Sequence, residues 1–153
     1  MRILFVCLGN ICRSPTAEGV MRRLVREQGL EDEIEIDSAG TGGWHAGNPP
    51  DARATAAAAQ RGIELTGAAR QVRPSDFDEF DLLVAMDRDN RDDLLALAPD
   101  EQARAKVRLL RDYDTGADAP DVPDPYYGGD DGFERVLDLV EEASASLLRE
   151  LRQ

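Results

Sequence analysis

The chain opens with the apolar run Arg2-Ile3-Leu4-Phe5-Val6-Cys7, which leads into Leu8-Gly9-Asn10-Ile11-Cys12-Arg13 and then Ser14-Pro15. A short apolar run that ends at a loop is typical of a buried strand. Ser is a favoured N-cap and Pro a favoured first residue of a helix, so the pattern predicts a helix capped by Ser14. Apolar residues then recur at helical spacing, and Gly29 is the expected stop. The chain therefore begins as a strand, a tight loop and a helix.

Strands and helices alternate along the rest of the chain. Further strands are predicted at 34–38, 82–86 and 106–110, and helices at 52–61, at 75–79, around Leu94 up to Pro99, and from Phe133 to Leu151. This alternation predicts a parallel sheet with helices on both faces. In such sheets ligands bind beyond the carboxyl ends of the strands, which is where the loop 7–13 lies.

One segment does not fit the alternation. Residues 111–132 are rich in Pro, Gly and Asp and have little to bury. A loop of this length inside a compact domain is usually functional or disordered. We therefore interpret it as a candidate functional loop.

Length and composition limit the possible classes of protein. The 153 residues, 42% of them hydrophobic, predict a single domain over 1–153. The formal net charge of −13, with scattered basic residues, argues against nucleic-acid binding. No run is long enough to span a membrane, and the start does not resemble a signal peptide. We therefore expect a cytoplasmic protein that does not bind membranes, with export by another route left open.

The loop between Cys7 and Arg13 has the composition of an anion cradle. Consecutive backbone N–H groups of such a loop form a nest for a dianion, and the helix that follows adds unpaired donors and the positive end of its dipole. Arg13 adds a planar fork that holds two phosphate oxygens. In this field we expect Cys7 to be a thiolate, with Ser14 donating a hydrogen bond to it. A structural reading stays open, in which Cys7 is a buried strand-end residue and Arg13 a solvated helix cap.

An acid is needed beside such a nucleophile if the ester oxygen that leaves is to be protonated. The loop 111–132 offers seven candidates, and residue chemistry alone does not choose among them. Pro123 and Pro125 stiffen the backbone around one of them, Asp124, and so favour it. The seven are Asp112, Asp114, Asp118, Asp121, Asp124, Asp130 and Asp131.

These segments resemble the motifs of a known family, the low-molecular-weight protein tyrosine phosphatases of the bacterial type. Residues 7–15 resemble the family's signature loop, and Asp124-Pro125-Tyr126-Tyr127 resembles its acid loop. The segments 37–41, 48–51 and 86–87 also match, so the resemblance covers essentially the whole chain. It implies a three-layer α/β fold with a four-stranded parallel sheet in the flavodoxin-like strand order 2-1-3-4.

The resemblance also implies a reaction. A phosphotyrosine in a protein, or a small aryl phosphate, would be hydrolysed through a phosphocysteine on Cys7. Arg13 would bind the phosphate, together with the loop residues Leu8, Gly9, Asn10, Ile11, Cys12 and Ser14. Asp124 would act as general acid and then as general base, and we interpret the other six Asp as solvated. No metal or other cofactor is implied, and inorganic phosphate and similar oxyanions would bind as product-like ligands.

The resemblance assigns further residues around this centre. Ile11, Trp44, Tyr126 and Tyr127 would line a deep cleft for the aryl group, and Ile11 offers an apolar wall where related phosphoarginine phosphatases have Thr. Asn10, Ser14 and Ser38 would brace the loop. Cys12 is either a small buried hydrophobe or a redox thiol that forms a disulfide with oxidised Cys7.

The chain departs from the family pattern at Gly67, where many members have a His before the Ala-Arg-Gln run. We therefore expect a loop-bracing network that is simpler or completed by water. His45, the only His, is interpreted as a rim or structural residue, and Asp87 as structural.

Several alternatives remain beside tyrosine phosphatase activity. They are a phosphoarginine phosphatase, a thioredoxin-coupled arsenate reductase of the same fold, a phosphocarrier domain and a non-catalytic phosphotyrosine-binding module. The reductase needs a further redox cysteine pair, and no Cys follows position 12. A monomer or a weak dimer is expected. The physiological target and any regulation by phosphorylation of Tyr126 or Tyr127 stay open.

Overall fold

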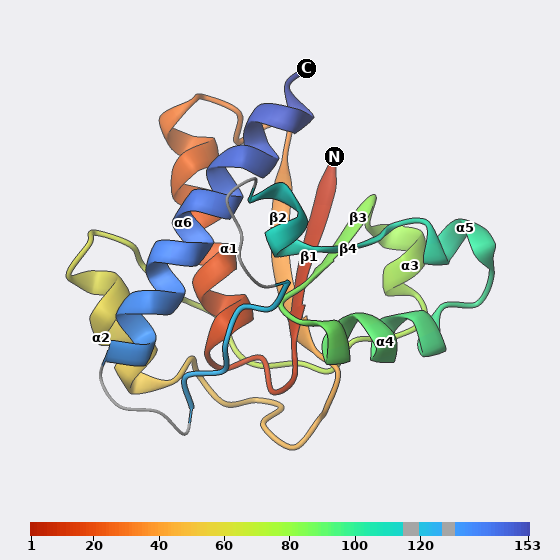
Figure 1. Cartoon of the computed structure of the whole chain (residues 1–153), viewed down its shortest axis with the longest axis horizontal. Coiled ribbons are helices and arrows are strands. Elements are labelled where there is room, and N and C mark those ends of the chain that lie inside the picture. Colours follow the sequence, from red (N-terminus) through yellow and green to blue (C-terminus); the bar gives the residue numbers. More distant parts are fainter. Residues whose placement is uncertain (115–119, 127–130) are drawn as a thin grey trace.

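The computed structural model describes residues 1–114, 120–126 and 131–153 and contains one parallel sheet (Figure 1). Its strands are β1 (Arg2–Cys7), β2 (Glu35–Gly40), β3 (Leu82–Ala85) and β4 (Val107–Leu109), in the order β2-β1-β3-β4. This confirms the predicted α/β fold and strand order.

Side chains of β1 point alternately to the two faces of the sheet, as strand geometry requires. Ile3 and Phe5 pack with Met21 and the other apolar residues of the helices α1 (Arg13–Glu27) and α6 (Asp131–Leu151). Leu4 and Val6 pack on the opposite face, with α3 (Asp76–Glu79) and α4 (Arg88–Leu97). Figure 1 shows α1, α2 (Ala52–Ala59) and α6 on one side of the sheet and α3, α4 and α5 (Glu101–Arg104) on the other. The central strand is therefore buried on both faces, which explains its continuous apolar run.

The first helix begins differently from the prediction. Ser14 was expected to cap it, but the helix starts at Arg13, with Cys12 at the N-cap position and no side-chain cap. The Ser14 hydroxyl contacts the Cys7 sulfur instead, so it is not available to the helix N–H groups. The other end agrees with the prediction: Gly29 has φ +69°, and Leu30 N donates to Val25 O as in a Schellman motif.

Two short elements were not predicted. The single-turn helix α5 follows Pro99, and the 3₁₀ turn η1 (Leu110–Tyr113) takes up the last residue of the strand expected at 106–110. One-turn elements have too few residues for a periodic signal. The expectation that 111–132 buries little was also wrong in part, because Arg111 and Val122 are buried. Val122 N donates to Met86 O, which anchors Val122 beside the end of β3.

The register of the sheet brings the loops that follow the strands to one edge. Cys7 pairs with Gly40, and Val6 pairs with Ala85, so β1, β2 and β3 end at nearly the same level. The loop 7–13, the glycine-rich segment after β2 and the residues after β3 therefore meet at this edge. In the described parts of the chain, no helix has both the length and the apolar content needed to cross a membrane.

Candidate active site

The loop 7–13 is held by backbone hydrogen bonds from two neighbouring segments. Thr41 N donates to Cys7 O, and Asp51 N donates to Ile11 O at 2.8 Å. Gly40 allows the end of β2 to lie close to this loop, because a Cβ there would be 2.8 Å from Leu8 O. Asn10 adopts φ +58°, a left-handed conformation that Asn tolerates better than most residues. The loop is therefore turned back on itself, between the end of β1 and the start of α1.

The sulfur of the buried residue Cys7 lies inside this turn, next to hydrogen-bonding groups. Asn10 N donates to Cys7 Sγ at 3.3 Å, and Ser14 Oγ lies 3.0 Å from the sulfur. These groups would stabilise a negative charge on the sulfur. The contact expected between Ser14 and Cys7 is present.

A set of buried hydrogen bonds links Asn10, Ser14 and Ser38. Asn10 Oδ1 accepts from Arg70 N, which sets the orientation of the Asn10 amide. Asn10 Nδ2 then donates to Ser14 Oγ at 2.8 Å and to Ser38 Oγ at 3.0 Å. Because Ser14 Oγ accepts from Asn10, its own proton is left for an acceptor, and Cys7 Sγ at 3.0 Å is nearer than Ala39 O at 3.4 Å. The structure therefore brings Asn10, Ser14 and Ser38 together around the sulfur.

The series of hydrogen bonds from Asn10 through Ser38 ends at Glu18, a residue that sequence reasoning missed. Ser38 Oγ donates to Glu18 Oε1 at 2.6 Å, and Arg22 pairs with the other carboxylate oxygen at 2.8 Å. Burial raises the pKa of Glu18, while the hydrogen bond from Ser38 and the charge of Arg22 oppose the shift. A signal was present in the sequence, because Glu18 is an acid on the buried face of α1, beside Ala17 and Val20.

The loop is braced without a side chain at position 67. The described residues supply direct partners: the backbone N–H of Arg70 donates to Asn10 Oδ1, and Ser38 Oγ donates to the Glu18 carboxylate. The expectation of a network that is simpler than in members with a His there, or completed by water, stays a prediction.

Arg13 is buried at the end of the loop and is held from one side. Arg13 Nη1 donates to Asp87 Oδ2 at 2.6 Å and to Val122 O at 3.0 Å, while Nη2 lies 3.6 Å from Asp124 Oδ2. Burial opposes the charge of Arg13, but the attraction of Cys7 and of Asp87 outweighs it and raises the pKa of Arg13. The guanidinium therefore stays charged and oriented. Asp87 also caps α4 through Asn90 N, which agrees with its expected structural role.

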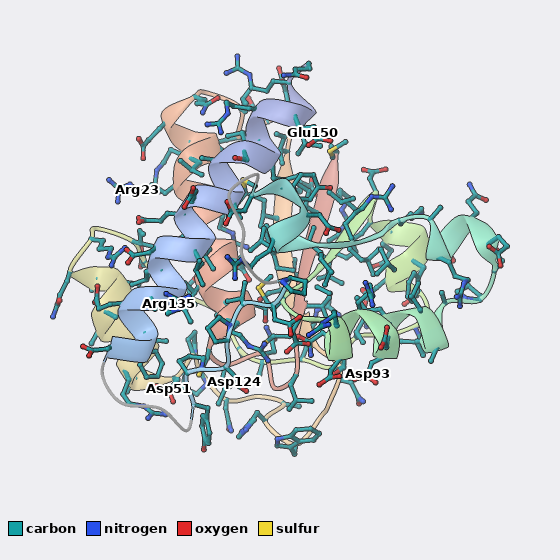
Figure 2. All side chains as sticks on the ribbon, viewed as in Figure 1. Arg23, Asp51, Asp93, Asp124, Arg135 and Glu150 are labelled. Carbon is teal, nitrogen blue, oxygen red and sulfur yellow. The ribbon has the colours of Figure 1, made fainter. Side chains whose placement is uncertain are left out.

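Asp124 stands at the mouth of the site, half-exposed, in the segment that follows Val122. Its Oδ1 accepts from Tyr126 N at 3.0 Å, and its Oδ2 faces Arg13. Figure 2 shows Asp124 at the same end of the molecule as Asp51, where the loops after the strands gather. Of the five acids of this segment that the structure describes, Asp124 is the one that lines a cavity together with Cys7 and Arg13.

The other acids were all expected to be solvated, and this was wrong for Asp114, which is buried beside Arg111. Asp121 is partly exposed and pairs with Arg88, while Asp112 is exposed, as expected, and accepts from Leu109 N. Asp112 and Asp114 stabilise the turn η1 and its end, and Asp121 stabilises the backbone just before Asp124. Asp131 is exposed at the start of α6, and Asp118 and Asp130 lie outside the described residues.

The cavity over the sulfur has apolar and aromatic walls. Its lining consists of Cys7, Leu8, Gly9, Ile11, Cys12, Arg13, Trp44, His45, Asp124 and Tyr126. The His45 ring lies between those of Trp44 and Tyr126, with centroid distances of 6.2 and 6.3 Å. This places His45 on the rim, as expected. Tyr127, the fourth residue expected in the cleft, lies outside the described residues.

The second cysteine differs electrostatically from the first. Burial, followed by the nearby charges of Asp51 and Cys7, raises the pKa of Cys12 to about 12. Cys12 is therefore a neutral thiol at neutral pH, and within residues 1–114, 120–126 and 131–153 its sulfur has no hydrogen-bond donor like those that face the Cys7 sulfur. Both thiols are free.

Comparisons with known proteins agree with this geometry. Residues 2–153 match the family model described as low molecular weight phosphotyrosine protein phosphatase. The low molecular weight protein-tyrosine-phosphatase of Streptomyces coelicolor is 54% identical over 155 residues, covering 99% of this chain and 94% of that protein.

Two crystal structures extend the likeness to three dimensions. That of a protein tyrosine phosphatase from Entamoeba histolytica, with Hepes in its active site, is 43% identical with a TM-score of 0.96 and covers 99% of this chain and 97% of its own. That of DARP, a Drosophila arginine phosphatase, is 31% identical with a TM-score of 0.94 and covers 100% and 99%.

The raised pKa of Glu18 predicts a specific dependence of stability on pH. Because the folded state holds the Glu18 proton more tightly than the unfolded state, stability is lost as pH rises from about 4.5, the ordinary value, through the raised pKa. Glu18→Gln keeps the acceptor for Ser38 and removes this loss. Urea unfolding across pH 4–8 should therefore show wild type losing stability relative to the variant as pH rises. A constant difference between the two would contradict the prediction.

Glu18→Ala provides the comparison for this measurement. It leaves the buried Ser38 hydroxyl without its acceptor, so we expect a loss of roughly 1–3 kcal/mol in unfolding free energy at every pH.

Proposed function

The chain belongs to the low molecular weight phosphotyrosine protein phosphatase family and is a protein tyrosine phosphatase, and we propose that it acts through a phosphocysteine intermediate on Cys7. The observation that carries this proposal is the meeting of a sulfur, a buried guanidinium and a half-exposed carboxylate in one cavity at the end of β1. The whole chain, 1–153, is taken as one catalytic domain.

In the first step Cys7 Sγ attacks the phosphorus in line with the bond to the tyrosine oxygen. The S–P bond forms, the P–O bond breaks, and Asp124 in its acid form gives its proton to the leaving oxygen. The backbone N–H groups of the loop from Leu8 to Arg13 would hold the three remaining phosphate oxygens. Inorganic phosphate and similar oxyanions should bind the same cradle.

Arg13 is positioned to hold the phosphate during this transfer. Nη1 already donates to Asp87 and Val122 O, so Nε and Nη2 would donate to the phosphate oxygens, with Nη2 also facing Asp124 Oδ2 at 3.6 Å. Two parallel bonds from one planar group both bind and orient the phosphoryl group. The anchored Nη1 means that the fork needs no rearrangement when the substrate arrives.

In the second step water attacks the phosphocysteine from the side that the phenol has left. Asp124, now a carboxylate, takes a proton from this water, and Cys7 leaves as a thiolate. The hydrogen bonds from Ser14 and Asn10 stabilise the departing sulfur. One carboxyl group therefore serves both steps, and this mechanism uses no metal or other cofactor.

The walls of the cavity favour an aryl phosphate. Ile11 provides an apolar side, and Trp44, His45 and Tyr126 form an aromatic rim. Phosphoarginine is the second candidate, because DARP shares this fold, but a guanidinium would find no hydroxyl at Ile11. A phosphotyrosine-bearing protein is therefore the proposed partner. We further propose a cytoplasmic monomer or weak dimer that binds neither nucleic acid nor membranes.

Cys12 is proposed as a redox partner of Cys7. Once Cys7 is oxidised to the sulfenic acid, attack by the Cys12 sulfur would give a disulfide and release water, which spares Cys7 from irreversible oxidation. Because Cys12 is a neutral thiol, it does not compete as a nucleophile toward phosphate esters.

Removal of the acid tests the mechanism. Asp124→Asn should lower kcat/KM about 100-fold for phenyl phosphate and clearly less for p-nitrophenyl phosphate, whose leaving group needs little protonation. Cys7→Ser should abolish turnover of both, and EDTA should have no effect. Asp131→Asn, the same charge change in an exposed residue, serves as the control. Equal losses on both esters in Asp124→Asn would contradict the acid role.

The substrate class is tested with matched peptides that carry phosphotyrosine, phosphoarginine or phosphoserine. Wild type should prefer phosphotyrosine by about 100-fold or more in kcat/KM. Ile11→Thr should narrow the gap to phosphoarginine, because it introduces a hydroxyl. Ile11→Val has the shape of Thr without the hydroxyl and should leave the preference unchanged. A wild-type preference for phosphoarginine would reverse the assignment.

The proposed role of Cys12 is tested with hydrogen peroxide. Wild type should recover most of its activity when dithiothreitol follows the peroxide, and peptide mass mapping should find a Cys7–Cys12 disulfide. Cys12→Ser should recover little, while its kcat/KM before oxidation stays within about twofold of wild type. Full recovery in Cys12→Ser would show that Cys12 does not protect Cys7.

A further inference from the structure

Arg53 joins three segments near the mouth of the cavity. Its guanidinium pairs with Asp51, with Nε 3.2 Å from Oδ1 and Nη2 3.1 Å from Oδ2, and Nη2 also donates to Tyr126 O at 3.2 Å. It lies over the ring of Tyr126 at 5.4 Å and over that of Phe133 at 4.9 Å. One side chain at the start of α2 thus contacts the acid segment and the first turn of α6.

The partner of Arg53 is tied to the phosphate-binding loop. Asp51 N donates to Ile11 O at 2.8 Å, and the Asp51 carboxylate caps α2 by accepting from Arg53 N. The pair Asp51–Arg53 therefore connects Ile11 with Tyr126. This connection does not pass through Arg13 or through a bound phosphate, so it is present before the substrate arrives.

The connection reaches the proposed acid through one further hydrogen bond. Tyr126 N donates to Asp124 Oδ1 at 3.0 Å, so the direction of the carboxylate follows the backbone at Tyr126. Arg53 holds the carbonyl group and the ring of that same residue. On the other side, the segment is anchored at Val122, whose N–H donates to Met86 O. Asp124 is therefore carried between two anchored points.

We propose that Arg53 is a positioning residue that holds Asp124 over the Cys7 sulfur by fixing the backbone at Tyr126. This inference rests on the proposed function, because it concerns how well the acid reaches the leaving oxygen. The planar fork is needed: only a group with several donors in one plane spans Asp51 and Tyr126 O while lying over two rings. A misplaced acid should lower the rate most for esters whose leaving oxygen is most basic, because these need protonation most.

A comparison of two esters tests this role. Arg53→Gln should lower kcat/KM about 10-fold for phenyl phosphate and less than about threefold for p-nitrophenyl phosphate, a weaker form of the effect expected for Asp124→Asn. Arg53→Lys keeps the charge without the fork and should show the same ester dependence. Asp51→Asn combined with Arg53→Gln should be no worse than Arg53→Gln alone, because Asp51 acts through Arg53.

Arg61→Gln is the matched control. Arg61, in the turn that follows α2, also contacts α6, through Glu134, Asp138 and Glu141, but these contacts do not involve the acid segment. Its loss should leave the ratio between the two esters unchanged. Arg53→Gln should unfold within about 3 °C of wild type, because a half-exposed ion pair adds little stability. If that variant does not fold, Arg53→Lys carries the same comparison.

The outcomes separate this proposal from the proposed function. Equal losses on both esters in Arg53→Gln, or a rise in KM alone, would overturn the positioning role and indicate substrate binding instead. A wild-type enzyme that hydrolyses neither ester would overturn the proposed function itself. An active wild type with the same ester ratio in Arg53→Gln would overturn only the role of Arg53.

Discussion

The hydrogen bonds that converge on the buried Cys7 sulfur are the constraint on which the rest of the site depends. A charged or polarised sulfur at the end of a central strand is unfavourable unless donors face it. Asn10 N and the Ser14 hydroxyl supply these donors, and each requires a special local structure. Asn10 must adopt a left-handed conformation, and Ser14 must give up the capping of α1. The tight turn of the loop follows from the need to surround one atom.

The buried charge of Arg13 imposes the second set of constraints. A guanidinium that is almost fully buried needs partners of opposite charge or carbonyl groups. Asp87 comes from the end of β3, and Val122 O comes from the long segment after η1. Residues 120–126 are thereby held beside the cradle, and Asp124 lies two residues after Val122. Arg13, which is proposed to bind the phosphate, therefore also helps to place the backbone that leads to the proposed acid, Asp124.

Two buried or half-buried acids have distinct proposed tasks in this arrangement. Glu18, behind the loop, keeps the hydroxyl of Ser38 pointing away from Asn10 and so orients the donors that reach the sulfur. Asp124, in front of the loop, faces the cavity. Glu18 acts on the sulfur indirectly, through a series of hydrogen bonds, whereas Asp124 is proposed to transfer a proton. The aromatic rim and Arg53 then restrict how the front acid and an aryl group approach each other.

Local patterns in the sequence determined the alternation of strands and helices, hence the parallel sheet, and they identified the loop 7–13. Periodicity and turn chemistry depend on residues that are close in the sequence, so they can be recognised from the sequence alone. Asp124 stood out among seven acids only through the family motif and two flanking prolines.

The tertiary structure alone decided the parts that join distant residues: Arg13 with Val122, Glu18 with Ser38 and Arg53 with Tyr126. A charged or polar group leaves no periodic mark that names its partner, because the partner is chosen by which segments the sheet register and helix packing bring together. The short elements α5 and η1 belong to the same class, since one turn is too brief to carry a pattern of its own.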